Sequence, residues 1–102
     1  MTRQKTSFLE TEGDGYFIRN ASKLVPRSDD PVVAAILQLG VRATAALEIG
    51  AANGHRLFTL RETLGCSGAG IDPSAAAIEA GRSTFPECDL RVGTADALPF
   101  AD

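Results

Sequence analysis

Short apolar runs alternate along this chain with segments in which hydrophobic residues recur every three or four positions. The runs "TAALEIG", "GAGID" and "DLRVGTA" are continuous rather than alternating, and they predict strands at 45–49, 68–72 and 90–94. The segments "SDDPVVAAILQLG", "GHRLFTLRETLG" and "PSAAAIEAGRSTF" have the spacing of amphipathic helices. The pattern therefore predicts a helix followed by β-α-β-α-β.

The ends of these helices have recognisable signals. Asp30 is placed to cap the first helix, Pro31 suits its first turn and Gly40 its end. Gly65 and Pro86 stop the two later helices. The residues predicted to be buried are Val33, Ile36 and Leu37 in the first helix, and Leu57, Leu60, Leu64, Ile71 and Ile78 in the rest of the chain.

Strands that alternate with helices of about ten residues predict parallel pairing through right-handed crossovers. We expect such strands to be buried on both faces, because helices cover both sides of a parallel sheet. The chain is short enough for one domain at most. Residues 1–28 are weakly patterned and are predicted to form a cap or lid segment, while 29–102 form the α/β domain.

Composition narrows the function classes. The chain has 102 residues, 44% of them hydrophobic, and a net charge of −3, which is typical of a globular domain and does not favour nucleic acid as a partner. No run approaches the ~20 apolar residues of a membrane span, and the first residues do not resemble a secretory signal. We therefore expect a cytoplasmic protein that does not bind membranes.

Two cysteines, Cys66 and Cys88, form neither a disulfide framework nor a zinc motif, so no metal is predicted. We interpret them as reduced thiols. Each precedes a predicted strand, so a bridge at one end of the sheet is geometrically conceivable, although nothing in the sequence requires it.

Three polar or glycine-rich features follow the predicted strands at their carboxyl ends, where parallel sheets bind ligands. They are the turn Gly50–Gly54, Asp72 and the segment Thr94–Asp96. The dinucleotide fingerprint G-x-G-x-x-G fails in this turn, because Ala52 and His55 replace its second and third glycines. A phosphate-binding P-loop is excluded as well, since the chain has no Gly-Lys-Ser/Thr.

The pattern acidic-x-G-x-G-x-G fits better, with Glu48, Gly50 and Gly54 in place and Ala52 as the middle residue. Asp72 lies 18 residues after Gly54, and it begins "DPSAAAIEAGR", which is followed later by "VGTADALPF". Together these segments resemble the motifs of class I S-adenosylmethionine-dependent methyltransferases, over roughly residues 43–102.

The resemblance implies a role for each matched position. Glu48 suits the cationic methionine part of S-adenosylmethionine, and Asp72 would accept hydrogen bonds from both ribose hydroxyls. Thr94 stands where the family usually has the aspartate that binds adenine, and Asp96 lies two residues later. The glycines keep side chains out of the ligand space, and Ala52 is tolerated if its backbone angles are ordinary. The predicted cofactor-binding residues are Glu48, Gly50, Ala52, Asn53, Gly54, Asp72, Pro73, Thr94, Ala95 and Asp96.

The resemblance also implies a fold, a Rossmann-like parallel sheet with flanking helices, here incomplete, with three strands in the order 3-2-1. The chain ends before the fourth strand of such enzymes, so we expect a cofactor-binding half, inactive alone, of a methyltransferase for a small-molecule acceptor. No catalytic residue is assigned. The first strand would be an exposed apolar edge, through which we expect self-association.

Other interpretations of these residues stay open. Glu48 could pair locally, and Asp72 before Pro73 could be only a turn former. Tyr16 and Arg19 form a lid, with Arg19 facing the methionine carboxylate, or belong to a surface segment. His55 is expected to lie solvated on the first helical turn. The rival functions are a nicotinamide-binding domain with a degenerate turn and a non-catalytic nucleoside-binding or scaffolding module.

Overall fold

A computed structural model describes the backbone of residues 3–98 and the side chains of residues 11–98. Its elements, in chain order, are α1 (Arg3–Asn20), the short 3-10 helix η1 (Ala21–Lys23), α2 (Pro31–Gln38), β1 (Ala45–Ile49), α3 (His55–Leu64), β2 (Ser67–Asp72), α4 (Ala75–Thr84) and β3 (Asp89–Val92). The predicted order of a helix followed by β-α-β-α-β is confirmed from α2 onwards.

The three strands form one parallel sheet in the order β1-β2-β3, which agrees with the 3-2-1 order expected. Leu47 is opposite Ala69, and Ile71 is opposite Arg91, so β2 lies in the middle. β3 ends at Val92, two residues earlier than predicted, and Thr94 instead forms an isolated antiparallel bridge with Ala97. The chain turns back on itself there, so the strand does not continue.

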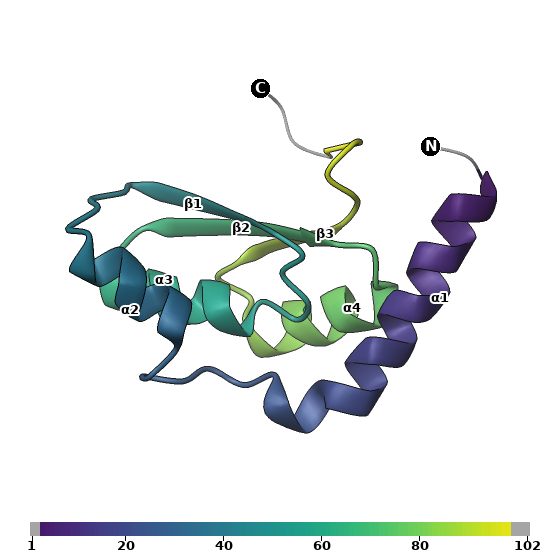
Figure 1. Ribbon diagram of the computed structural model, residues 1–102, viewed down its shortest axis with the longest axis horizontal. Helices are drawn as coiled ribbons and strands as arrows, with labels where there is room; N and C mark the ends of the chain where they lie inside the picture. The colour runs from purple at the N-terminus through teal and green to yellow at the C-terminus, as the bar shows by residue number, and fades with distance from the viewer. Residues whose placement is uncertain (1–2, 99–102) are drawn as a thin grey trace.

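Figure 1 shows α3 and α4 on one face of the sheet, with α2 beside α3 and α1 near the carboxyl ends of the strands. No helix within residues 3–98 lies on the other face. The prediction that the strands are buried on both faces is therefore wrong for β1. Its alternate residues Leu47 and Ile49 are 50% and 55% exposed, whereas Ala46 and Glu48 are half-buried.

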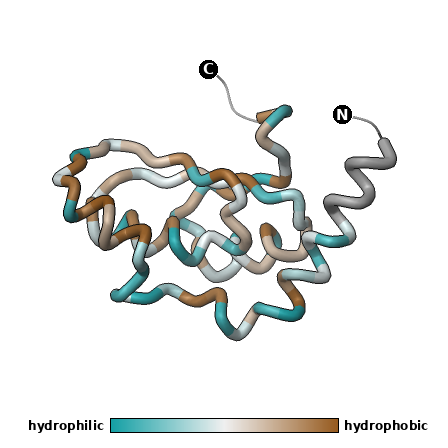
Figure 2. Tube along the Cα trace, in the orientation of Figure 1, coloured by the Kyte–Doolittle hydropathy of each residue, from teal (hydrophilic) through white to brown (hydrophobic). Residues whose placement is uncertain are grey.

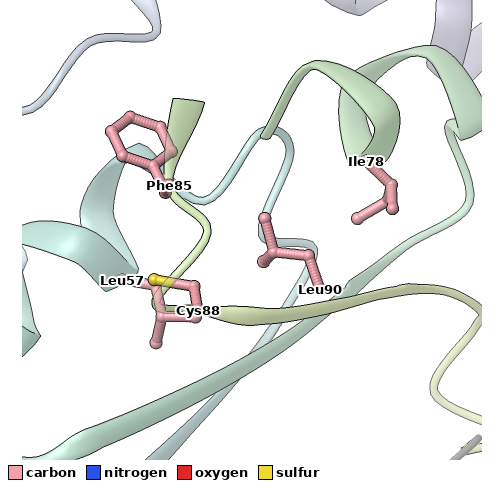
Figure 3. Close-up of a cluster of buried hydrophobic side chains, with 5 residues drawn as sticks. All are labelled: Leu57, Ile78, Phe85, Cys88 and Leu90. Carbon is pink, nitrogen blue, oxygen red and sulfur yellow. The ribbon is translucent and has the colours of Figure 1, made fainter. Parts of the chain in front are cut away.

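The core lies between the sheet and the helices α3 and α4. Figure 3 shows its main cluster, formed by Leu57, Ile78, Phe85, Cys88 and Leu90. The predicted core residues Leu57, Leu60, Ile71 and Ile78 are buried, and Leu64 is half-buried.

Helix α2 differs from its prediction in what it buries. Figure 2 shows it as a strongly hydrophobic segment, yet only Val33 is buried, and Leu37 is exposed. α2 lies outside the helix layer and packs on α3 rather than on the sheet, so a narrow strip of its surface is covered. Its start is as predicted: the Asp30 side chain caps it by accepting from the N–H groups of Val32 and Val33.

Most of the predicted cap segment is the helix α1, which the weak hydrophobic pattern did not indicate. It packs against α4, and one of its side chains forms hydrogen bonds at the beginning of that helix. Asp14 Oδ1 accepts hydrogen bonds from Ser74 Oγ at 2.5 Å and from the N–H of Ala76 at 3.1 Å. Ser74 in turn caps α4 by accepting from the N–H of Ala77. This contact holds α1 beside the ends of the strands.

Cys66 and Cys88 are both buried, and neither is in a disulfide bond. Burial raises the pKa of the Cys88 thiol above its ordinary value. Among the described residues, no helix is long and apolar enough to cross a membrane, and no cluster of His, Cys, Asp or Glu is arranged to hold a metal ion.

Candidate functional site

The turn between β1 and α3 is held by backbone hydrogen bonds. The N–H groups of Gly50 and Ala51 both donate to the carbonyl of Ile71, each at 2.9 Å. Gly50 has a φ of +78°, and a side chain there would meet no atom within 4 Å, so the position opens onto free space. Ala52 has a φ of +53°. The condition under which Ala52 was expected to be tolerated, ordinary backbone angles, is not met, because the turn needs the left-handed region here.

Asp72 fastens the turn from the neighbouring strand. Its Oδ2 accepts from the N–H of Ala52, and its Oδ1 accepts from the N–H of Ser74, both at 2.9 Å. One carboxylate thus connects the turn after β1 with the start of α4. Because each oxygen can accept a second hydrogen bond, this structural role leaves capacity for a ligand.

Beside this turn lies a cavity of about 490 Å³ at the carboxyl ends of the strands. Five of the residues predicted to bind a cofactor line it: Glu48, Gly50, Ala52, Asp72 and Pro73. The remaining lining residues come from α1, from the residue that follows η1 and from the helices that follow the strands: Glu12, Gly13, Tyr16, Phe17, Leu24, His55, Arg56 and Ala77.

Glu48 is the least satisfied polar group of the cavity. Its side chain is 19% exposed, and its Oε1 is buried without a hydrogen-bond partner in the part of the chain that the structure describes. Its Oε2 is 3.8 Å from Nη1 of Arg56, too long for a hydrogen bond. Burial raises the pKa of the Glu48 carboxyl above its ordinary value, although the Arg56 charge opposes the shift.

Arg56 is bound mainly to Asp30 rather than to Glu48. Its Nε lies 2.9 Å and 3.1 Å from the two carboxylate oxygens of Asp30. Burial alone would raise the pKa of Asp30, but the hydrogen bonds from Arg56 and from two backbone N–H groups lower it below its ordinary value. The guanidinium is therefore shared between two carboxylates, and its charge opposes the rise in the Glu48 pKa without reversing it.

Two predicted site residues of the turn do not line the cavity. Asn53 Nδ2 donates to the carbonyl of Leu24 at 2.9 Å, so this side chain holds the N-terminal segment. Gly54 is buried, and a Cβ there would be 3.0 Å from the side chain of Leu90. Its missing side chain lets α3 approach β3, so it has a packing role.

Thr94, Ala95 and Asp96 also lie outside the cavity lining. They follow β3, and Thr94 Oγ1 donates to Asp96 Oδ1 at 2.5 Å. The structure brings Asp72 near β3, since the N–H of Gly93 donates to its carbonyl at 3.1 Å. The end of the motif, residues 99–102, lies outside the described residues.

The N-terminal contribution to the cavity was only partly predicted. Tyr16 and Phe17 line it, as a lid would, but Arg19 does not and forms an exposed pair with Glu12 at 3.0 Å. His55 was expected to be solvated; instead it is half-buried and lines the cavity. Its position directly after the glycine turn was the available signal.

No protein-family model and no curated protein matches the chain by sequence. Solved structures match by shape. One is titled "Complex between the Haloferax volcanii Trm112 methyltransferase activator and the putative methyltransferase", with a TM-score of 0.67 and 25% identity over 92% of this chain and 42% of that one. Another is the MccD protein, with a TM-score of 0.64 and 20% identity over 76% of this chain and 38% of that one.

The chain has a class I methyltransferase-like fold. It spans about two fifths of the length of the structures it matches. The resemblance drawn from the glycine turn, Asp72 and the segment after the third strand is confirmed at the level of the fold.

Proposed function

We propose that this chain is the cofactor-binding part of an S-adenosylmethionine-dependent methyltransferase that acts on a small molecule. The observation that carries the proposal is the carboxylate of Glu48, which lines the cavity beside the glycine turn and whose buried Oε1 has no hydrogen-bond partner among the described residues. A buried acceptor without a donor costs about 1–3 kcal/mol, which a ligand donor would recover. The ammonium group of the cofactor is such a hydrogen-bond donor.

The charges of the cavity support a cationic ligand. Glu12, Glu48 and Asp72 line it, and the cation among its lining residues, Arg56, is bound to Asp30. S-adenosylmethionine carries positive charge on its sulfonium and its ammonium. Its positive end therefore suits the side of the cavity near Glu48.

The nucleoside part would lie against Asp72. The two carboxylate oxygens each accept one backbone N–H and each retain the capacity for another hydrogen bond, as two ribose hydroxyls require. Gly50 leaves open space beside them. Thr94 and Asp96 lie outside the cavity lining, so adenine would have to extend from Asp72 toward the segment after β3.

The rival functions differ in what they would bind. A nicotinamide dinucleotide needs its pyrophosphate close to the turn and the start of α3. Here the Glu48 carboxylate lies at the cavity beside the turn and would repel a pyrophosphate, whereas Asp72 would suit the ribose of either ligand. A non-catalytic nucleoside-binding module would bind adenosine as well as the complete cofactor, since it would need no contact with the methionine part.

Calorimetric titration separates these functions. We expect saturable binding of S-adenosylhomocysteine, weaker binding of adenosine and no binding of NAD. Glu48→Gln should weaken S-adenosylhomocysteine binding and leave adenosine binding unchanged, whereas Glu62→Gln, an exposed position on α3, should change neither. Equal affinity for adenosine and S-adenosylhomocysteine, or preferential binding of NAD, would contradict the proposal.

A further inference from the structure

The side-chain amide of Asn53 is fixed in one orientation by two backbone groups. Its Nδ2 donates to the carbonyl of Leu24 at 2.9 Å, and its Oδ1 accepts from the N–H of His55 at 3.2 Å. A carbonyl accepts and an N–H donates, so exchanging the amide oxygen and nitrogen would break both hydrogen bonds. The oxygen of Asn53 therefore faces His55.

This orientation determines the tautomer of His55. Its Nδ1 lies 2.9 Å from Asn53 Oδ1, which has no proton to give, so Nδ1 must carry the proton in this hydrogen bond. In the neutral imidazole the other nitrogen, Nε2, is then an acceptor with a free lone pair. None of the hydrogen bonds described for residues 11–98 uses Nε2, and it is not among their buried unsatisfied atoms.

His55 lies at the boundary of two cavities. It lines the 490 Å³ cavity, and it also lines a neighbouring one of about 300 Å³ between η1 and the start of α2. Leu24 and Arg56 are the other residues that line both. The imidazole thus stands where a ligand in the larger cavity meets the N-terminal segment.

We propose that His55 is a further ligand-binding residue, whose Nε2 accepts a hydrogen bond from the ammonium group of the cofactor bound in the larger cavity. This inference rests on the proposed function. It assigns the ammonium two acceptors, the Glu48 carboxylate and His55 Nε2, which come from β1 and from the first residue of α3. A sulfonium nucleoside without an ammonium group would lose both contacts.

The surroundings favour the neutral form that this role needs. Burial lowers the pKa of His55 below its ordinary value, and the Arg56 charge lowers it further, while Asp30 opposes the shift. The charged groups that line the two cavities are Glu12, Lys23, Arg27, Asp29, Asp30, Glu48, Arg56 and Asp72. Protonation of Nε2 would remove the acceptor and place a cation against the ammonium, so binding should weaken as the pH falls.

The tautomer can be observed directly, because His55 is the only histidine in the chain. Long-range proton–nitrogen NMR spectra of the nitrogen-15-labelled chain near pH 7.5 should show a protonated Nδ1 and an unprotonated Nε2. Asn53→Ala should allow both tautomers. A protonated Nε2 in the wild-type spectrum would overturn the proposal.

The ligand contact is tested with S-adenosylhomocysteine, which has the same ammonium group. Saturation with this ligand should shift the Nε2 resonance. Between about pH 7.5 and 5.5, the affinity of the wild type should fall by a factor that is about threefold or more larger than the factor for His55→Gln. A threefold difference corresponds to a ligand-induced shift of roughly half a unit in the pKa of His55. Glutamine retains an acceptor but does not titrate, so the ratio isolates the histidine.

Two results would contradict the proposed His55 contact, and they differ in what they imply for the proposed function. Binding of S-adenosylhomocysteine with an unchanged Nε2 resonance and equal pH dependence in both proteins would overturn the contact and leave the proposed function standing. Absence of binding at both pH values would overturn the proposed function together with the contact.

Discussion

Ala52 holds the most strained backbone conformation of the candidate site. Its φ of +53° lies in the left-handed region, which costs an alanine about 1–2 kcal/mol and a glycine almost nothing. The hydrogen bond from its N–H to Asp72 Oδ2 is part of what keeps the turn in this shape. The strain is located where the turn meets the cavity.

Ala52→Gly should raise the free energy of unfolding by up to about 1 kcal/mol, because relief of the strain exceeds the added flexibility of the unfolded chain. Without the positive φ, which the sequence does not reveal, the greater flexibility of glycine in the unfolded chain would predict the opposite sign. Urea unfolding measures the change. Ala51→Gly is the matched control. Because Ala51 is buried and has no positive φ, this variant should have a lower free energy of unfolding than the wild type. A lower stability for Ala52→Gly would contradict this account of the turn.

The buried position of Glu48 at the cavity lowers the stability of the folded chain. Because burial raises its pKa, the ionised carboxylate is costly in the folded state, so Glu48→Gln should be more stable than wild type at pH 7. The folded chain holds its proton more tightly than the unfolded chain. The wild type therefore regains stability as the pH falls through the raised folded pKa toward 4.5, and the difference shrinks there. Urea unfolding of both proteins across this range checks the sign; a difference that is constant with pH would refute it.

At the scale of elements, the helices that flank the strands could be predicted from the sequence, and α1 could not. Helices α2, α3 and α4 have apolar spacing and end signals, whereas α1 contains Gly13 and Gly15 and has no clear apolar stripe. Its attachment depends on a long-range contact, from Asp14 to Ser74 and Ala76, which a local pattern cannot show. For the same reason Phe17 and Leu24 were not assigned to the cofactor site and Tyr16 was assigned to a lid only as one of two interpretations, although all three line the cavity.

Substitution by alanine should change the free energy of unfolding in opposite directions at two helical glycines. At Gly81 on α4, a Cβ would overlap the carbonyl oxygen of Asn53, so Gly81→Ala should force α4 away from the turn and cost about 1–3 kcal/mol. At Gly15 on α1, a Cβ would meet the flexible end of Arg19, and the better helix propensity of alanine should stabilise by up to about 1 kcal/mol. Thermal or urea unfolding measures the stability of both variants relative to the wild type. Equal effects at the two positions would show that packing of α4 on the turn does not constrain Gly81.

At the scale of the whole molecule, the described residues leave the outer edge of β1 without a neighbouring strand. Leu47 and Ile49 on that strand are about half exposed on the face that no helix within residues 3–98 covers. An apolar strand edge without proline or lysine favours pairing with another chain. The sequence indicated this edge through the strand order, but not that one face of β1 would also be open.

We therefore expect the chain to self-associate through β1 at high concentration. Leu47→Lys should shift it toward the monomer without loss of fold, because the side chain is exposed. Ile18→Lys, which changes an exposed residue of α1, should associate like wild type. Sedimentation velocity at increasing concentration decides this, and a wild-type chain that stays monomeric would contradict it.

The central claim is that S-adenosylmethionine, or its demethylated product S-adenosylhomocysteine, binds at the carboxyl ends of the three strands. The most direct measurement is the two-dimensional amide NMR spectrum of the labelled chain during titration with S-adenosylhomocysteine. We expect saturable shifts at Gly50, Ala52, Asp72 and His55, and also at Tyr16, which lines the same cavity. Shifts confined to Leu47 and Ile49 on the open face, or an unchanged spectrum at a large ligand excess, would contradict it.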